Sequence, residues 1–576
     1  MKACPKCYRQ YLDETLNFCL DDGEHLLDGP ATAILSERVG HSVHPSEEPT
    51  KEFNRASDTN SSDGGASNKP DHLTSKRNWL IAGAAGFLIA TALGVGSYWY
   101  YSDDDDDARR IDSIAVMPFE NASGDPETEY LSEGLTDSLV YRLSQVADLK
   151  VSPATSVARY KGKEIDPIKV GNELGISSVL VGRITQRGDS LVVSANLIDV
   201  RNEQSLWGEL YDRKLSDLLA TQREIAREIA EALKIQVSRE QGITKTYTNS
   251  NEAYLLQLQG RFHLEKRTRQ EMDRAITCFQ KAILLDPNFA LAYVGIADTY
   301  NAMVPYGYMK PSEGFTEARA AAKRALEIDP LLAEAHSAYA FVIGSYDWNW
   351  AEAEREHKRA IELSPNREGP YFYYATGHLI PVGRFEEAEA MLRKAIQIEP
   401  NSIRSNGRLA TTLRYARRFD EGLAQARKAN DLDPGSLANR GEMISALTQK
   451  GLYDEAIRIG EESLVAAPDY PQVLTALSMA YARGGRQNDA RKKLAEWETT
   501  WRSQAGYSSR VARIYIALGE RENAFEALQK AVDNRDFILP RERASVEYDD
   551  LREDPRFIDL MRRMNLPDLN IPTGQK

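Results

Sequence analysis

The sequence predicts a multidomain chain: a small metal-binding segment, one transmembrane helix, an α/β domain and an all-α superhelix. Three observations predict this fold class. Residues 79–101 form a run of 23 residues without a charge. From residue 111, short apolar runs alternate with amphipathic ones, as strands alternate with helices in a sheet domain. After residue 252 a proline recurs at a spacing near 34 residues, which indicates a repeat architecture.

The overall composition limits the classes of protein that fit. A chain of 576 residues is too long for one hydrophobic core and predicts three or more units. Its formal net charge of −14 argues against nucleic acid as the main partner of the bulk of the chain. Four cysteines among 576 residues exclude a disulfide scaffold. Globular units joined by linkers fit these values.

Residues 1–28 carry four candidate zinc ligands. A CPKC turn is followed by a third cysteine and, where a fourth is usual, by an aspartate; the candidates are Cys4, Cys7, Cys19 and Asp22. Two ligands on a tight turn and two on a short hairpin provide a tetrahedral set for zinc. Asp21 and His25 are alternative fourth ligands. A segment of this size holds no core without a metal.

The CPKC turn and the glycine of FCLDDG resemble the small zinc ribbons at the N-termini of many bacterial proteins. The resemblance implies one structural Zn²⁺ and departs from the family at Asp22. The alternative is a metal-free turn with three free thiols.

Residues 29–78 come next and are rich in Ser, Asp, Asn, Gly and Pro, with almost no apolar periodicity. This composition predicts a flexible linker.

The uncharged run at 79–101 predicts one membrane span. At about 1.5 Å rise per residue, a helix of this length reaches about 34 Å, which exceeds a hydrocarbon core of about 30 Å. Trp79 stands at one end and four aromatic residues, 98–101, at the other, where such rings favour the headgroup level. A buried core helix is the alternative, but a polar linker precedes the run and an acidic stretch follows it.

The orientation of the span follows from its flanks. Three of the four cysteines lie in the first 19 residues, where a reducing cytosol keeps thiols free for metal. Lys and Arg are slightly more frequent on the N-terminal side of the span. We therefore expect residues 1–78 in the cytoplasm and 102–576 outside the cytoplasmic membrane.

Small residues recur along one face of the span, at Ala82, Gly86, Ala90 and Gly94. Such a face favours pairing of two spans and therefore a homodimer. The alternative is that small residues are simply common in any membrane span.

Residues 111–240 read as an α/β domain. The run 113–119 predicts a buried strand, 128–146 an amphipathic helix, 177–210 a three-stranded meander and 215–237 a closing helix. Several segments resemble the TolB-like amino-terminal domain, which precedes repeat arrays in many bacterial cyclases, kinases and winged-helix regulators. These segments are 115–121, 133–139, 173–184, 195–200 and 206–213. The resemblance implies a non-catalytic sensing or docking domain and carries over no ligand.

The proline repeat predicts an array of helix pairs over 252–534. The recurring residues are Pro287, Pro330, Pro365, Pro400, Pro434 and Pro468. A period of 34 is that of tetratricopeptide repeats (TPRs), in which each helix–turn–helix buries its apolar face only by stacking on its neighbours. A further unit at 515–534 lacks the proline and brings the count to seven. Residues 535–576 read as a closing helix and tail. The extra loop around VPYGYMKPSEGF and the segment 346–356, YDWNWAEAERE, both recur in arrays that follow TolB-like domains.

A repeat array of this kind commonly holds a protein or peptide partner in a groove lined by the first helices of its pairs. Arg404, Arg414 and Tyr373 fall on such helices and are candidate groove residues. The alternative for each is a solvated face or core packing. The histidines lie in different repeats, so no shared metal site is expected; they are His263, His336, His357 and His378.

These features predict a non-catalytic single-pass membrane protein that acts as a scaffold or signalling receptor through protein–protein interaction. The sequence contains no phosphate-binding loop and no nucleophile–base motif, so we expect no enzyme. The alternative is a membrane-bound signalling or transcription regulator whose N-terminal segment acts on a cytosolic partner or on nucleic acid.

Overall fold

The computed structural model describes residues 111–569, except 147–148, 234–244 and 502–505, and three short strands near the N-terminus. The chain divides into two compact units, Met1–Arg110 and Ile111–Lys576, which are described separately. The predicted linker and membrane span, with its stripe of small residues, lie outside the described residues. Within the part of the chain that is described, no helix combines the length and the apolar character needed to cross a membrane.

The described part of the N-terminal unit is a small antiparallel sheet with the strand order β2-β1-β3. Its strands are β1 (Lys2–Ala3), β2 (Gln10–Tyr11) and β3 (Leu27–Asp28). Ala3 stands opposite both Gln10 and Leu27. The predicted zinc ligands Cys4, Cys7, Cys19 and Asp22 lie outside the described residues, so the zinc site stays a prediction.

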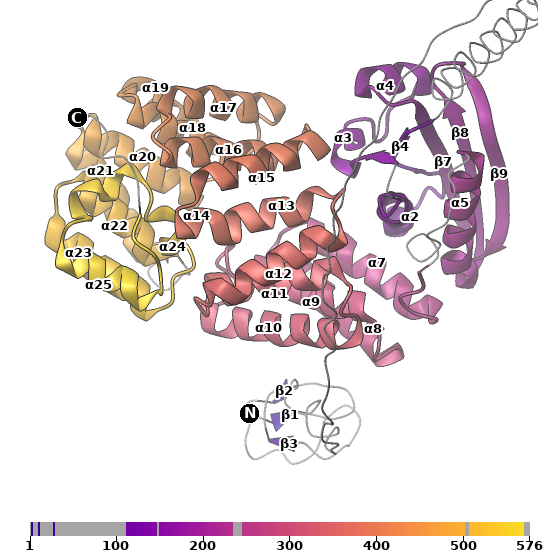
Figure 1. Ribbon diagram of the computed structural model, residues 1–576, viewed down its shortest axis with the longest axis horizontal. Helices are drawn as coiled ribbons and strands as arrows, with labels where there is room; N and C mark the ends of the chain where they lie inside the picture. Colours follow the sequence, from indigo (N-terminus) through magenta and orange to yellow (C-terminus); the bar gives the residue numbers. More distant parts are fainter. Residues whose placement is uncertain are drawn as a thin grey trace, which may run out of the picture. The chain divides into compact units, whose positions relative to one another are not determined.

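The second unit begins with a mixed sheet of strand order β6-β4-β7-β8-β9, with β5 paired to β7 (Figure 1). The strands are β4 (Ser113–Val116), β5 (Glu120–Asn121), β6 (Lys150–Ser152), β7 (Ser178–Arg187), β8 (Ser190–Asp199) and β9 (Gln204–Lys214). Strand β4 pairs in parallel with β6 and β7, whereas β7, β8 and β9 form an antiparallel meander. The predicted buried strand and three-stranded meander are confirmed.

Helices cover both faces of this sheet because alternate residues of β4 point to opposite sides. Ile114 and Val116 enter a core with α2 (Glu129–Leu143) and α5 (Leu218–Ala232). The side chain of Ala115 enters a second core with α3 (Ala154–Ala158) and α4 (Pro167–Leu174). Helix α4 ends at Gly175, whose φ of 63° favours glycine.

The residues from 251 to 533 form an array of eight helix pairs (Figure 1). The pairs are α7 (Asn251–Glu265) with α8 (Arg269–Leu285), α9 (Ala290–Met303) with α10 (Pro311–Ile328), α11 (Ala333–Ser345) with α12 (Trp350–Leu363), α13 (Glu368–Tyr374), η3 (Ala375–Leu379) and α14 (Ile380–Val382) with α15 (Phe385–Ile398), α16 (Ile403–Tyr415) with α17 (Phe419–Leu432), α18 (Leu437–Gln449) with α19 (Tyr453–Ala466), α20 (Pro471–Arg483) with α21 (Gln487–Trp501), and α22 (Tyr507–Ala517) with α23 (Arg521–Asp533). Short turns between the helices make each pair antiparallel.

The proline spacing located the pairs correctly, and small residues explain their packing. Five of the six prolines have an alanine five residues before them, and all five alanines are buried, which lets neighbouring helices approach closely; they are Ala282, Ala325, Ala360, Ala395 and Ala429. The array holds one pair more than the seven counted from the sequence. The additional pair is α20 with α21, and no proline motif follows α21 to mark it.

The α/β domain and the first repeats share one hydrophobic core. Leu135 of α2 and Ile225 of α5 belong to the same buried cluster as Tyr254 and Leu258 of α7. A Cβ atom on Gly134 would lie 2.7 Å from Cδ1 of Leu258, so this glycine permits the close contact between α2 and α7. The sheet domain is therefore packed onto the array as part of it.

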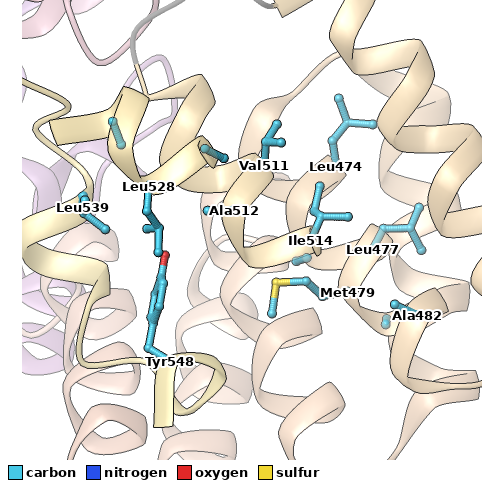
Figure 2. Packing of buried hydrophobic residues seen from close by; sticks show 14 of the residues in the cluster. Leu474, Leu477, Met479, Ala482, Val511, Ala512, Ile514, Leu528, Leu539 and Tyr548 are labelled. Atoms are coloured by element: carbon cyan, nitrogen blue, oxygen red, sulfur yellow. The ribbon is translucent and has the colours of Figure 1, made fainter. Parts of the chain in front are cut away.

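Residues 534–569 follow the array and form what we call the C-terminal strap. It contains α24 (Leu539–Glu542), the 3₁₀ turn η4 (Val546–Leu551) and α25 (Pro555–Arg563). The closing helix predicted from the sequence is confirmed as α25, which packs on α23. Figure 2 shows Leu539 and Tyr548 of the strap among side chains of α20, α22 and α23, in one buried cluster.

The strap also reaches repeats far from the end of the array. The ring of Phe537 packs against Phe315 of α10, with centroids 5.9 Å apart. The Arg543 guanidinium donates to the carbonyl of Pro381 in α14, at 3.0 Å from Nη2. Since α10 belongs to the second pair and α23 to the eighth, the strap connects opposite ends of the array.

Candidate functional site on the first helices of the array

The candidate site is the surface formed by α9, α11, α13, α16 and α22, which we call the first-helix face. Two of the residues predicted from the sequence meet there. The Arg404 guanidinium lies 5.5 Å from the ring centroid of Tyr373 and 4.6 Å from that of Phe372. Tyr373 in turn packs edge to face against Phe341, at 6.2 Å. An arginine over aromatic rings is a cation–π arrangement, common where proteins bind peptides.

A buried glutamate fixes the orientation of Arg404. Nε of Arg404 donates to Oε1 of Glu368 at 3.1 Å, and its Nη2 bonds the other carboxylate oxygen. Ser402 donates to the same carboxylate at 2.9 Å. Burial alone would raise the pKa of Glu368, but Arg404 and the hydroxyl donors outweigh burial and lower it. The Arg404 side chain remains 48% exposed, so an oriented cation faces solvent.

The prediction that Arg414 faces the groove is wrong. Its side chain is 3% exposed and forms an ion pair with Glu442 at 2.6 Å. Glu442 also accepts a hydrogen bond from Gln472 at 2.9 Å, so the group belongs to the core packing between α16, α18 and α20. The reason is helical geometry: ten residues from Arg404 is about 2.8 turns, which places Arg414 on another face.

Arg408 is the arginine that shares a face with Arg404, because four residues are close to one turn. Sequence reasoning missed it, although the i, i+4 spacing would have found it. Within the described part of the chain, no carboxylate lies within ion-pair distance of Arg408, and its Nε is buried without a hydrogen-bond partner. Burial, and then the charge of Arg541 in the strap, lowers the pKa of Arg408 to about 10.

An acid without an ion-pair partner among the described residues lies on the same face. Asp298 of α9 is partly buried, and burial raises its pKa to about 7 against the opposing effect of Arg261 and Arg267. Burial raises the pKa of Tyr373 of α13, and the negative charge of Asp298 also contributes to raising it. The first-helix face therefore carries an acid on α9 and cations on α16.

Two histidines that the sequence placed in separate repeats meet in the structure. Tyr374 lies between them, with its ring centroid 5.8 Å from that of His357 and 5.8 Å from that of His378. Burial, and then the charge of His378, lowers the pKa of His357 to about 3, and neither of its ring nitrogens has a hydrogen-bond partner in the part of the chain that is described. In the described residues, no group of three or more His, Cys, Asp or Glu is arranged to hold a metal ion.

The YDWNW segment, residues 346–350, ends at the first residue of α12 and holds the strap. The carbonyl of Tyr346 accepts from Nη1 of Arg535 at 2.8 Å. The indole of Trp350 donates to the carbonyl of Met564 at 2.9 Å. Arg535 also lies 4.7 Å from the ring centroid of Trp348. These contacts explain the aromatic residues of this segment: they hold the strap against the array.

The strap inserts a carboxylate between array arginines. Glu547 is buried, lies 3.7 Å from Nη2 of Arg513, and accepts from Gln449 at 3.5 Å. Burial alone would raise the pKa of Glu547, but Arg513 and Arg483 outweigh it and lower the pKa to about 2. The array thus accommodates one acidic side chain of the strap.

Comparisons with known proteins match both parts of this unit. The family described as the second domain of the HilA/YgeH-like transcriptional regulators matches residues 109–228. A tetratricopeptide-repeat family matches residues 379–402 and 508–535. The helical array is therefore a TPR superhelix. The α/β domain is similar to a HilA-like domain, and its TolB-like resemblance stays a prediction.

Two curated relatives cover part of the chain. A protein of Rhizobium meliloti strain 1021, provisionally named adenylate cyclase 3, is 30% identical over 255 residues, which are 42% of this chain and 42% of the relative. The transcriptional regulator HilA of Salmonella typhimurium is 23% identical over 305 residues, which are 50% of this chain and 51% of the relative. The chain spans about half the length of these relatives.

Among solved structures, the chain is similar to Pseudomonas aeruginosa pilF, with 18% identity, a TM-score of 0.31 and coverage of 41% of this chain and 97% of that one. It is also similar to yeast Tom70, with 16% identity, a TM-score of 0.37 and coverage of 55% and 69%.

Proposed function

We propose that the chain is a non-catalytic scaffold that captures an extended segment of a partner protein on the first-helix face of its TPR superhelix. The observation that carries the proposal is the group formed by Arg404, Tyr373 and Phe341. Its cation is already held in place by Glu368, so binding a partner orders few side chains. An oriented arginine beside aromatic rings is typical of the residues that contribute most to binding energy.

The proposal includes attachment to a membrane. Residues 79–101 would anchor the chain once, with residues 1–78 in the cytoplasm and 102–576 outside. Cys4, Cys7, Cys19 and Asp22 would hold a structural Zn²⁺ on the cytoplasmic side. The support for both comes from the sequence. Stoichiometric zinc in the purified full chain under reducing conditions, lost on Cys4→Ser, is the expected result, and metal-free protein would contradict it.

The first-helix face is tested by photo-crosslinking in intact cells. A photoreactive residue replaces Tyr373, and a control replaces Val465 of α19, which is 84% exposed. We expect a discrete protein crosslink from position 373 and none from position 465. Arg404→Glu should abolish this crosslink because it places a second carboxylate beside Glu368. Identical products from both positions would contradict the proposal.

A second candidate function is a membrane-bound signalling or transcription regulator whose N-terminal segment acts on a cytosolic partner or nucleic acid. The HilA-like match over residues 109–228 favours it. The same crosslinking separates the two candidates. An envelope protein captured at position 373 supports the scaffold with its external superhelix. Capture of cytosolic transcription proteins there would overturn the proposed topology and support the regulator.

A further inference from the structure

We propose that strand β9 pairs antiparallel, edge to edge, with the same strand of a second copy of this chain. In the described part of the chain, β9 ends the sheet order β6-β4-β7-β8-β9, so no strand lies along its outer edge (Figure 1). A long edge strand with unpaired backbone groups is a template for pairing with another chain. The inference goes beyond the proposed function and does not depend on the first-helix face.

The backbone hydrogen bonds of β9 alternate between its two edges. The N–H of Leu215 donates to the carbonyl of Asp189 at 2.8 Å, and these two residues continue the register in which β8 and β9 are paired. In an antiparallel pair every second residue bonds its neighbour, so the odd-numbered residues from 207 to 213 bond β8. The residues between them direct their N–H and C=O groups to the outer edge; they are Gly208, Leu210 and Asp212.

The side chains of β9 point alternately to the two faces of the sheet. On one face, the indole of Trp207 donates to Oε2 of Glu228 in α5 at 3.2 Å, and the hydroxyl of Tyr211 donates to the same oxygen at 2.6 Å. Leu210 points to the opposite face and is 66% exposed. A leucine with this exposure in an edge strand offers apolar area that a second chain would bury.

The charges of β9 favour a second copy as the chain that pairs with it. Edge charges usually keep two sheet edges apart. Strand β9, however, carries two acids and two bases and is neutral, although the whole chain has a net charge of −14. In an antiparallel pair the basic end of each strand, Arg213 and Lys214, lies beside the half of the other strand that contains Glu209. Opposite charges on facing strands stabilise the pair, so β9 is complementary to itself.

Backbone geometry and charge together select one register. The two strands must place their outward-bonding residues opposite each other, so in a two-fold pair one residue of β9 faces its own copy. An axis at Glu209 or Asp212 would place like charges directly opposite each other, which is destabilising. An axis at Tyr211 would place Leu210 against the carboxylate of Asp212. An axis at Leu210 places the two leucines opposite each other, where each buries the other.

The remaining pairs are compatible with an axis at Leu210. Arg213 stands opposite Trp207 of the second copy, on the face that carries α5, where guanidinium and indole can form a cation–π contact. Gly208 stands opposite Asp212, and no like charges face each other directly. The sheets of the two copies would then form one continuous sheet.

The first experiment forms a disulfide between two copies of the full chain in detergent. In Leu210→Cys the two new cysteines would face each other with Cα atoms about 5.5 Å apart, and a disulfide spans about 4.4–6.8 Å. In Asp212→Cys they would lie about 14 Å apart, because each is four residues along the strand from the position opposite its copy. Mild oxidation should give at least about tenfold more dimer from Leu210→Cys than from Asp212→Cys. The wild type, with its four native cysteines, gives the background.

Hydrogen exchange of single amides tests the pairing without a new cysteine. The N–H groups of Leu210 and Asp212 should exchange at least about tenfold more slowly in concentrated than in dilute protein, because only the second copy bonds them. Leu210→Lys opposes two ammonium groups and should remove this protection without lowering the Tm. Leu331→Lys, at an exposed leucine of the array, should retain the protection. Equal crosslinking at positions 210 and 212, no crosslinking above the background, or protection that Leu210→Lys retains would overturn the proposal.

Discussion

The imidazole of His336 lies between two hydrogen-bond acceptors. Its Nδ1 is 2.5 Å from Oε2 of Glu356, and its Nε2 is 2.9 Å from the carbonyl oxygen of Pro330. The ring can donate to both acceptors only when both nitrogens carry protons. Burial opposes the charge, but these hydrogen bonds outweigh it and raise the pKa of His336 above its usual value.

We therefore predict a stability contribution from His336 that depends on pH. Because the pKa is higher in the folded chain, the contribution is fully present below the unfolded pKa of about 6.5 and is lost as pH rises through the folded value. Thermal unfolding of the wild type and of His336→Gln between pH 6 and 9 checks this. The Tm advantage of the wild type should shrink across that range. A constant difference would show that the ring stays neutral.

At the scale of residues, the sequence located some of the site. Tyr373 and Arg404 were predicted on adjacent first helices and are in contact. Arg414 was assigned to the same face but is buried against Glu442, whereas Arg408, four residues from Arg404, was passed over. Residue type and repeat position indicate which helix carries a side chain, but the partner that buries it comes from another repeat and leaves no local signal.

The strap is an element whose stability depends on apolar packing. Tyr548 is fully buried (Figure 2). Its ring stacks on Phe557 with centroids 5.7 Å apart, and its hydroxyl has no hydrogen-bond partner among the described residues. A buried hydroxyl without a partner costs free energy, while the ring contributes by burial. The ring, and not the hydroxyl, therefore holds this part of the strap.

Two substitutions of Tyr548 should have opposite consequences. Tyr548→Phe keeps the ring and removes the unpartnered hydroxyl, so we expect equal or greater stability. Tyr548→Ala removes the ring and should cost about 3–5 kcal/mol of unfolding free energy. Urea unfolding measures both, and limited proteolysis reports release of the strap in the alanine variant. Destabilisation by Tyr548→Phe would mean that the hydroxyl has a bonding role.

At the scale of elements, repeat spacing predicted the helices well and the strap incompletely. A closing helix was expected within residues 535–576, and α25 (Pro555–Arg563) is that helix. Its path back along the array depends on contacts such as Trp350 with Met564 and Arg543 with Pro381, which join residues far apart in the chain. A pattern of local periodicity contains no information about such pairs.

For the second unit as a whole, the shared core has an energetic consequence. Leu258 is 6% exposed and contacts both the array and α2 of the sheet domain. Leu258→Ala should cost about 2–5 kcal/mol and lower the unfolding temperature of sheet and helices together. Calorimetry of the full chain checks this, with exposed Leu452→Ala as the control. Two separate transitions, only one of them shifted, would show that the domains unfold independently.

The strap also imposes an order in time on assembly. It is synthesised after every helix that it contacts, from α10 to α23, so those helices can stack while their contact surfaces for the strap are still uncovered. During that interval the parts of Phe315, Trp348 and Trp350 that the strap covers in the finished chain are uncovered, so an unfinished chain exposes additional apolar surface to chaperones or to a partner. If a partner segment bound the array before the strap was synthesised, docking of the strap would then retain that segment. The rate of translation would determine how long the array remains accessible.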